Sequence, residues 1–142
     1  MSVALGRAVV TGRVDRVEVA ADGRLRILDL KTGASKPTAD ELRRHGQLGA
    51  YQLAVEEGAF GEHGVRSGGA ALLQLGRAAG ARTTLQLQTP LESDDEPGWA
   101  RDLVEEVAAE MGGAVFAATP GPACGTCRLK DSCPAFAEGR RL

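Results

Sequence analysis

Two acidic residues and a lysine stand close together in the first quarter of the chain. Asp15 lies in the run GRVDR, and Asp29, Leu30 and Lys31 lie in the run ILDLKTG. Carboxylate oxygens are ligands that Mg²⁺ and Mn²⁺ prefer, and a bound divalent ion can polarise a phosphodiester and activate water. A neighbouring ammonium group can stabilise charge on the phosphate. These residue types predict a metal-dependent hydrolytic site; the alternative is a solvated strand face with a surface ion pair.

The positions of the two acids depend on a predicted β-hairpin. The runs 9–19 and 24–31 are rich in valine, isoleucine and leucine, and Ala-Ala-Asp-Gly joins them. A two-residue loop would pair Asp15 with Leu30 and send the two carboxylates to opposite faces. A three-residue loop, with its final glycine left-handed, would pair Asp15 with Asp29. We predict the three-residue loop, because it places both acids where one cation can bridge them.

A helix is expected to complete this site. Residues two apart share a strand face, so Asp29 and Lys31 should lie side by side. A helix over 39–57, preceded by a Thr-x-x-Glu capping box, carries Gln47 and Tyr51. These two are four residues apart and therefore share one helix face. The alternatives are a surface amide for Gln47 and a core aromatic with a wet hydroxyl for Tyr51.

The order of the three runs resembles a known family. GRVDR, ILDLKTG and QLGAYQLAV are similar to the RecB-like branch of the PD-(D/E)XK nucleases. That branch includes the nuclease domains of helicase–nucleases of the RecB, AddB and AdnA/AdnB kinds and CRISPR-associated exonucleases. The resemblance implies a restriction-endonuclease-like α/β core. It also implies DNA end-processing in recombinational repair, with an attached or partner helicase.

The resemblance also implies roles for individual residues. Asp15, Asp29 and the Leu30 backbone carbonyl would be ligands of Mg²⁺ or Mn²⁺. The residues that would catalyse or support the reaction are Lys31, Gln47 and Tyr51. Two rival classes stay open: a catalytically incompetent DNA-binding or scaffold domain of nuclease-like fold, and a zinc-knot interaction module.

Basic residues near the predicted site are candidates for DNA contact. The chain has a net charge of −2, which is weak support for nucleic-acid binding. A local basic patch is nevertheless compatible with that total, and its other interpretation is a soluble surface. The DNA-binding candidates are Arg13, Arg16, Lys36, Arg43 and Arg44.

All three cysteines stand in the tail. Cys124 and Cys127 form a Cys-x-x-Cys pair, and Cys133 follows six residues later, before a proline. Thiolates so clustered suit zinc or iron–sulfur. The spacing resembles the C-terminal cysteine triplet of the iron–sulfur members of the same nuclease branch, which implies a [4Fe–4S] cluster. The fourth cysteine of that cluster is missing here, so zinc is the competing interpretation, and inert thiols are another.

The rest of the chain fits one α/β domain with a tail. Further strands are predicted over 70–75 and 83–89, joined by a Gly/Ala/Arg turn, and a second helix over 99–117. The sheet should be four-stranded, mixed and mostly antiparallel, with flanking helices. We expect a nuclease core over 1–119 and a cysteine-rich segment over 120–142. The upstream helical segment that the family normally has is not in this sequence, so we expect the chain to be the C-terminal part of a larger nuclease or helicase–nuclease, or a truncated open reading frame.

Several features are predicted to have no role in the site. The acidic segment 90–98 is interpreted as a solvated, mobile charge run. His45 and His63 are interpreted as exposed or structural residues and not as metal ligands. In the strand 83–89, leucines alternate with polar residues, which indicates one wet face. The sequence has no stretch apolar enough to span a membrane and no signal-peptide pattern, so we expect a cytoplasmic location.

Overall fold

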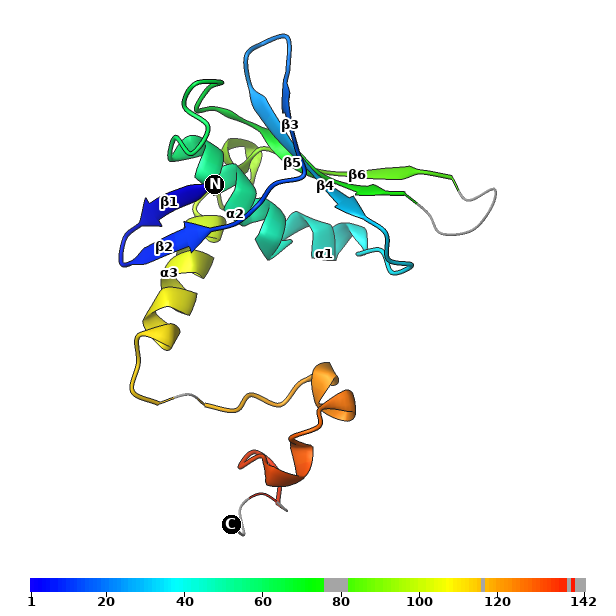
Figure 1. Ribbon diagram of the computed structural model, residues 1–142, viewed down its shortest axis with the longest axis vertical. Helices are drawn as coiled ribbons and strands as arrows, with labels where there is room; N and C mark the ends of the chain where they lie inside the picture. The colour runs from blue at the N-terminus through cyan, green and yellow to red at the C-terminus, as the bar shows by residue number, and fades with distance from the viewer. Residues whose placement is uncertain (76–81, 116, 138, 140–142) are drawn as a thin grey trace. The chain divides into compact units, whose positions relative to one another are not determined.

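The computed structural model describes residues 1–75, 82–115, 117–137 and 139. The chain divides into two compact units, Met1–Ala109 and Glu110–Leu142. The first unit holds all the β-strands (Figure 1). The turn predicted between the strands 70–75 and 83–89 lies outside the described residues. None of the described helices is both long and apolar enough to cross a membrane.

The first unit is built on a four-stranded mixed sheet. Its strands are β3 (Arg16–Val19), β4 (Leu25–Lys31), β5 (Ser67–Gln74) and β6 (Thr84–Gln88), in that spatial order. The outer pairs, β3 with β4 and β5 with β6, are antiparallel, and the central pair is parallel. The parallel pair needs a crossover, which the helices between β4 and β5 provide. The α/β class and the mixed, mostly antiparallel sheet are as predicted.

The hairpin between β3 and β4 has the three-residue loop. Arg16 pairs with Leu28 and Val19 with Leu25, so the next rung outward joins positions 15 and 29. The Gly23 N–H donates to the Ala20 carbonyl at 2.9 Å, and Gly23 has φ +77°. A glycine without Cβ adopts that left-handed conformation at little cost, which lets the loop close. The predicted register is confirmed.

The predicted first strand was wrong in its extent. Residues 9–19 do not form one strand but contribute to two different sheets. β1 (Ser2–Leu5) and β2 (Ala8–Thr11) form a separate antiparallel hairpin. The N-terminal ammonium of Met1 donates to the Gly12 carbonyl at 2.9 Å, which closes this hairpin before the chain turns toward β3. The short β1 had no apolar run of its own to reveal it in the sequence.

The predicted helix 39–57 is also divided. α1 (Ala39–Arg43) begins with the predicted capping box, in which the Thr38 hydroxyl accepts from the Glu41 N–H. The second segment, α2 (Gly46–Glu56), starts after a two-residue break. Arg44, with φ −113° and ψ 32°, leaves the helical conformation.

The break between α1 and α2 is caused by a contact with a distant part of the chain, which the local sequence does not predict. The Gln88 amide of β6 donates to the Leu42 carbonyl at 2.8 Å and to the Arg43 carbonyl at 3.3 Å. Carbonyls at a helix end need a partner outside the helix. The buried amide meets this need and allows α1 to end there.

α2 lies between the hairpin β1–β2 on one side and the four-stranded sheet on the other (Figure 1). Leu48 and Val55 pack toward the sheet, while Leu53 and Ala54 pack toward the hairpin. Fully burying a leucine or valine side chain contributes about 1.5–3 kcal/mol, so this two-sided packing fixes the helix firmly. Position 49 of α2 requires glycine, because a Cβ there would lie 2.3 Å from the Trp99 ring.

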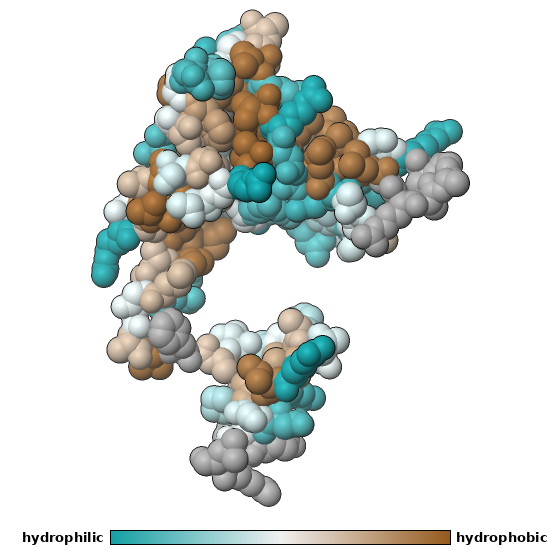
Figure 2. Space-filling view, in the orientation of Figure 1, coloured by the Kyte–Doolittle hydropathy of each residue, from teal (hydrophilic) through white to brown (hydrophobic). Residues whose placement is uncertain are grey.

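The strand β6 has the predicted alternation, but the leucines lie on its exposed face and the glutamines on the face toward the helices. Leu85 and Leu87 are about half exposed, at 49% and 54%, whereas Gln88 is buried. The glutamines face the helices because their amides bond backbone carbonyls there, including that of Pro37. Hydrophobic side chains, drawn in brown, lie exposed in the region of β5 and β6 in Figure 2. Alternation alone cannot say which face is buried.

The acidic segment after β6 is not a free charge run. It begins with a short 3₁₀ turn, Leu91–Ser93. Arg44 pairs with Asp94 at 2.6 Å and with Glu96 at 3.1 Å, and the Asp94 side chain is only 7% exposed. Hydrogen bonding from the Glu96 N–H and from Arg44 lowers the pKa of Asp94. The acidic segment therefore holds the C-terminal end of α1 in place through Arg44.

The last helix, α3 (Trp99–Met111), ends before the predicted residue 117. Gly112 and Gly113 follow it directly, and glycine favours ending a helix. Within the second unit, the chain forms two short 3₁₀ turns, Pro122–Thr126 and Lys130–Ser132.

Candidate functional site

The carboxylate of Asp29 is the centre of a polar cluster at the end of β4. Asp29 is buried, at 4% exposure, although it carries a charge. Its Oδ1 accepts hydrogen bonds from Gln47 Nε2 at 2.9 Å and from the Tyr51 hydroxyl at 3.3 Å. Its Oδ2 accepts no hydrogen bond and has Lys31 Nζ beside it at 2.7 Å. Hydrogen bonds therefore hold Oδ1 in place, and Oδ2 already has a cation, the Lys31 ammonium group, beside it.

The other members of the cluster hold one another. Lys31 Nζ donates to Gln47 Oε1 at 2.9 Å, and Gln47 Nε2 also lies 2.8 Å from the Tyr51 hydroxyl. The Tyr51 hydroxyl has the Arg13 carbonyl as a second acceptor at 3.2 Å. We call Asp29, Lys31, Gln47 and Tyr51 the site cluster. The structure thus brings together four residues that the sequence placed on two separate elements.

Local structure explains why these side chains meet. Asp29 and Lys31 are two apart on β4 and point to the face that α2 covers, where Ile27 is fully buried. Gln47 and Tyr51 are one turn apart on α2 and face the sheet. Gln47 is in the first turn of α2, so the break before Gly46 decides where its amide lies.

Asp15 lies beside this cluster without joining it directly. It precedes β3 by one residue, in the register position opposite Asp29. Its Oδ2 accepts the Leu30 N–H at 2.8 Å, and its side chain is exposed. The structure therefore holds the Asp15 carboxylate against the backbone of the residue that follows Asp29.

Burial shifts two pKa values around the cluster. Burial raises the pKa of Tyr51, so its hydroxyl stays protonated at neutral pH and can donate. Burial, with help from the nearby Lys31 charge, lowers the pKa of His45, while Asp29 acts in the opposite direction. The imidazole of His45 is therefore neutral at pH 7, which limits the positive charge beside Lys31.

The five basic candidates do not form one free patch. Arg16 pairs with Glu18 at 2.8 Å, and Arg43 pairs with Asp95 at 3.0 Å. Arg44 has its two acidic partners and also lies 5.3 Å from the centre of the Trp99 ring. Among the ion pairs of the described residues, Arg13 and Lys36 take no part.

A second polar cluster was missed from the sequence. Gln52 Nε2 donates to Gln88 Oε1 at 2.9 Å and to the Thr89 carbonyl at 3.0 Å. Gln52 Oε1 accepts from the Ser67 hydroxyl at 2.8 Å and from the Leu91 N–H at 3.1 Å. We call Gln52, Ser67 and Gln88 the Gln52 cluster; all three are buried. The signal available was a glutamine within an otherwise apolar stretch of helix.

The tail cysteines are free thiols in the structure. Cys124 lies within the first 3₁₀ turn, and Cys127 and Cys133 each follow a turn. Across the part of the chain that the structure describes, no three His, Cys, Asp or Glu side chains form a group able to hold a metal. The predicted cluster ligands therefore do not come together here.

The same finding limits the metal chemistry near Asp29. Among the described residues, the carboxylates of Asp15 and Asp29 are the potential ligands at the end of β4, and no group of three ligands forms there. Mg²⁺ commonly binds one or two carboxylates and keeps several waters, so a two-carboxylate site suits it better than a closed cage. Asp29 Oδ2 is buried with Lys31 Nζ at 2.7 Å, so such an ion would share this oxygen with the ammonium group.

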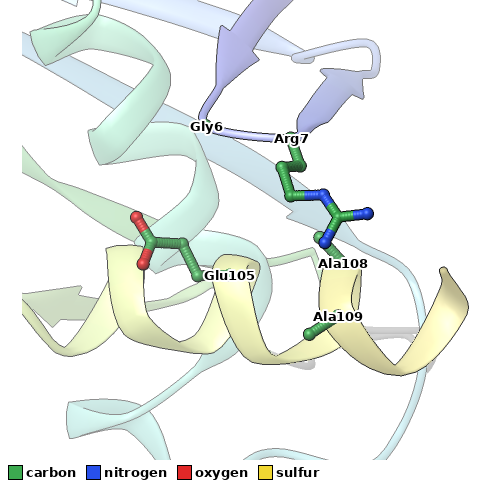
Figure 3. A pocket seen from close by; sticks show the side chains of 5 residues that line it. All are labelled: Gly6, Arg7, Glu105, Ala108 and Ala109. Atoms are coloured by element: carbon green, nitrogen blue, oxygen red, sulfur yellow. The ribbon is translucent and has the colours of Figure 1, made fainter. Parts of the chain in front are cut away.

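A cavity of about 360 Å³ lies away from these residues, between the β1–β2 turn and α3. Its lining includes Arg7 from the turn and Glu105 from the helix (Figure 3). It contains none of the predicted site residues, so we assign it no part in the chemistry.

Comparison with known families places this site in context. The sequence profile described as the PD-(D/E)XK nuclease superfamily matches residues 1–134. The matched region includes the site cluster, Asp15 and the three cysteines. Among curated proteins, no sequence matches the chain.

Proposed function

The chain belongs to the PD-(D/E)XK nuclease superfamily, and from that membership we propose that it hydrolyses phosphodiester bonds of DNA ends. The observation that carries the proposal is the Asp29–Lys31 pair at 2.7 Å, supported by Gln47 from α2. A carboxylate and an ammonium group held together at the end of a strand suit phosphate chemistry.

Each member of the site cluster has a role in this proposal. Lys31 orients the attacking water and stabilises charge that develops on the scissile phosphate. Gln47 holds Lys31 and Asp29 at once, so it fixes the distance between the cation and the carboxylate. The Tyr51 hydroxyl stays protonated and donates a hydrogen bond to Asp29 Oδ1, which restrains the carboxylate rotamer.

The metal in this proposal is Mg²⁺ or Mn²⁺. Asp15, Asp29 and the Leu30 carbonyl would hold it, with water completing the coordination. Such an ion supplies a Lewis acid for the phosphate and lowers the pKa of bound water. The Leu30 N–H holds Asp15 near this position through its Oδ2, which leaves Oδ1 for a ligand.

The decisive experiment compares the unmodified chain with Asp29→Asn. Cleavage of linear single-stranded DNA, measured with Mg²⁺ and separately with Mn²⁺, should fall by at least about 10³-fold in the variant. Asparagine has the shape of aspartate and keeps one oxygen that can accept the Tyr51 hydrogen bond, so the variant should still fold and unfold cooperatively in urea. Retained cleavage in a folded Asp29→Asn variant would contradict the proposal. A matched RNA substrate tests whether DNA is the preferred polymer.

The two-carboxylate site also supports a second candidate, a nuclease-like domain that binds DNA without cutting it. Saturable DNA binding without cleavage under any divalent metal would select this candidate.

Two finer elements of the sequence prediction are also proposed. We infer that the chain acts within a helicase–nuclease of recombinational repair, and that its core, 1–119, and its tail, 120–142, are separate parts. Cys124, Cys127 and Cys133 would bind iron–sulfur or zinc with a further ligand. Purification without oxygen tests this, because an iron–sulfur protein absorbs near 400 nm whereas a zinc protein is colourless.

A further inference from the structure

A cavity of about 420 Å³ opens beside the site cluster. Its lining includes Lys31, Lys36, Pro37, His45, Leu72 and Gln74. This volume is in the lower part of the range for small-molecule sites. Because Lys31 belongs both to the cavity and to the site cluster, whatever occupies the cavity lies next to the reacting phosphate.

Gln74 is the unusual residue of this cavity. It is 3% exposed, and its Oε1 is buried without a hydrogen bond. An unpaired buried polar atom costs about 1–3 kcal/mol, so a protein seldom keeps one without a use. A second unpaired atom, His45 Nδ1, belongs to another residue of the same lining.

The sheet arranges polar groups in a row along the cavity. Lys31 of β4 pairs in register with Gln74 of β5, and Gln74 pairs with Thr84 of β6. Neighbouring strands are about 4.8 Å apart, so the row extends roughly 10 Å from Lys31. Lys36 Nζ is held at its far end by the Thr84 hydroxyl at 2.8 Å. Lys31, which is paired with Asp29, therefore stands at one end of the row and Lys36 at the other, and the unpaired Gln74 Oε1 lies between them.

The lining also includes an acid, Glu41, whose carboxylate is engaged in the capping box. Glu41 accepts from the Thr38 N–H at 2.7 Å and from the Thr38 hydroxyl at 3.0 Å, as part of the capping box. It forms no ion pair among those of the described residues, and Lys36 forms none either. Lys36 is thus a cation held by a neutral hydroxyl and free to meet an anion.

We propose that this cavity binds one nucleotide unit of the substrate strand, next to the phosphate that is cut. Lys36 pairs with the phosphate of that unit, and the Gln74 amide bonds its sugar or base. A nucleotide combines an anion with hydrogen-bonding groups at about this spacing, which neither inorganic phosphate nor an apolar ligand does. The inference rests on the proposed nuclease function and adds the residues that hold the strand beside the reaction.

The test measures binding of a fluorescein-labelled ten-nucleotide thymidine oligomer by the full chain in EDTA, where cleavage does not occur. Lys36→Met should weaken binding by roughly tenfold and reduce the slope of log Kd against log salt by about 0.7, the value for one phosphate contact on a single strand. Arg7→Met is the matched control, since it removes the same charge at the β1–β2 turn (Figure 3) and should change neither quantity.

Gln74→Met separates binding from structure. Methionine keeps the volume and removes an amide whose oxygen has no partner, so the melting temperature should stay equal or rise. Binding should weaken threefold to tenfold, with the salt slope unchanged, because a neutral hydrogen bond is lost. Deoxythymidine 5′-monophosphate should compete with the oligomer in the unmodified chain and compete less well in this variant.

Each result has a clear meaning. Unchanged binding in both variants, or no binding by the unmodified chain, overturns the nucleotide site. A lower melting temperature with unchanged binding in Gln74→Met also overturns it and makes Gln74 structural. Binding that depends on both residues, in a chain that cleaves nothing with any metal, supports the nucleotide site and overturns only the proposed hydrolysis.

Discussion

Two polar clusters lie on the helix-covered face of one sheet, and they are built differently. The Gln52 cluster is neutral, and each amide atom of Gln52 has a partner. The site cluster carries a buried carboxylate and an ammonium group, and one carboxylate oxygen accepts no hydrogen bond. Both clusters take a glutamine from the same helix, five residues apart.

The difference separates structure from function. A buried polar network that is fully satisfied stabilises one arrangement of the chain. A network that keeps a charged pair partly buried beside a cavity sacrifices stability, and this is common where a protein binds a ligand. We therefore expect the Gln52 cluster to control folding and the site cluster to control activity. Four experiments test this division, starting with the largest effect.

Of these four experiments, Lys31→Met should have the largest effect on activity. The variant loses the ammonium group that faces Asp29, so cleavage of single-stranded DNA should fall by roughly 10²–10³-fold. Lys31→Arg is the control, because it keeps the charge but not the compact ammonium geometry, and it should recover only part of the activity. Full activity in Lys31→Met would show that the site cluster is structural too.

The two glutamines of α2 provide a matched pair. Gln52→Leu leaves the Leu91 N–H and the Thr89 carbonyl without a buried partner, so the free energy of unfolding in urea should fall by about 3–5 kcal/mol. Cleavage per folded molecule should change by no more than about twofold. The same substitution at the exposed Gln47 should lower stability by less than about 1 kcal/mol and cleavage by roughly 10–100-fold, as for groups that orient a metal site. Equal stability losses at both positions would remove the distinction.

Tyr51 belongs to both the core and the site, so its effect should be intermediate. Tyr51→Phe keeps the ring in the core but removes the hydroxyl that bonds Asp29. Stability should fall by about 1 kcal/mol and cleavage by about tenfold. Because the folded protein raises the pKa of Tyr51, the unmodified chain should lose stability as pH rises above 10.0. The variant should lack that part of the loss.

The smallest effect concerns His45 and acid pH. Burial and Lys31 lower its pKa, Asp29 opposes them, and the unfolded chain therefore binds a proton more readily than the folded one. Stability should then decrease as pH falls from about 7 through 6.5 and level off below the folded-state pKa. His45→Gln should reduce this decrease in urea titrations at pH 7 and pH 5. A steeper decrease in the variant would contradict the sign.

The predicted fold was correct where local rules govern the chain. Asp22-Gly23 predicted the hairpin, and Thr38 with Glu41 predicted the start of α1. The sequence did not reveal the break between α1 and α2, because its cause is the Gln88 amide on a strand more than forty residues later. The sequence also left open which face of β6 is buried. The alternation of leucine and glutamine is the same whether the leucines or the glutamines face the helices.

For the candidate site, too, the sequence predicted what depends on local spacing and did not predict what depends on contacts between distant segments. Periodicity placed Asp29 beside Lys31 and Gln47 above Tyr51, because strand and helix spacing are properties of the local backbone. The ion pairs of Arg43 and Arg44 could not be anticipated, since their acidic partners lie about fifty residues further along the chain.

By itself, the sequence determined which chemical groups this protein has, and where each lies along its own strand or helix. Only the tertiary structure decided that the two glutamines of α2 have opposite uses, and that Gln74 and Lys36 adjoin the same opening as Lys31. The physical reason is that strand and helix geometry depends on residues near in sequence. Whether a buried polar atom finds a partner depends on segments that meet only when the chain has folded.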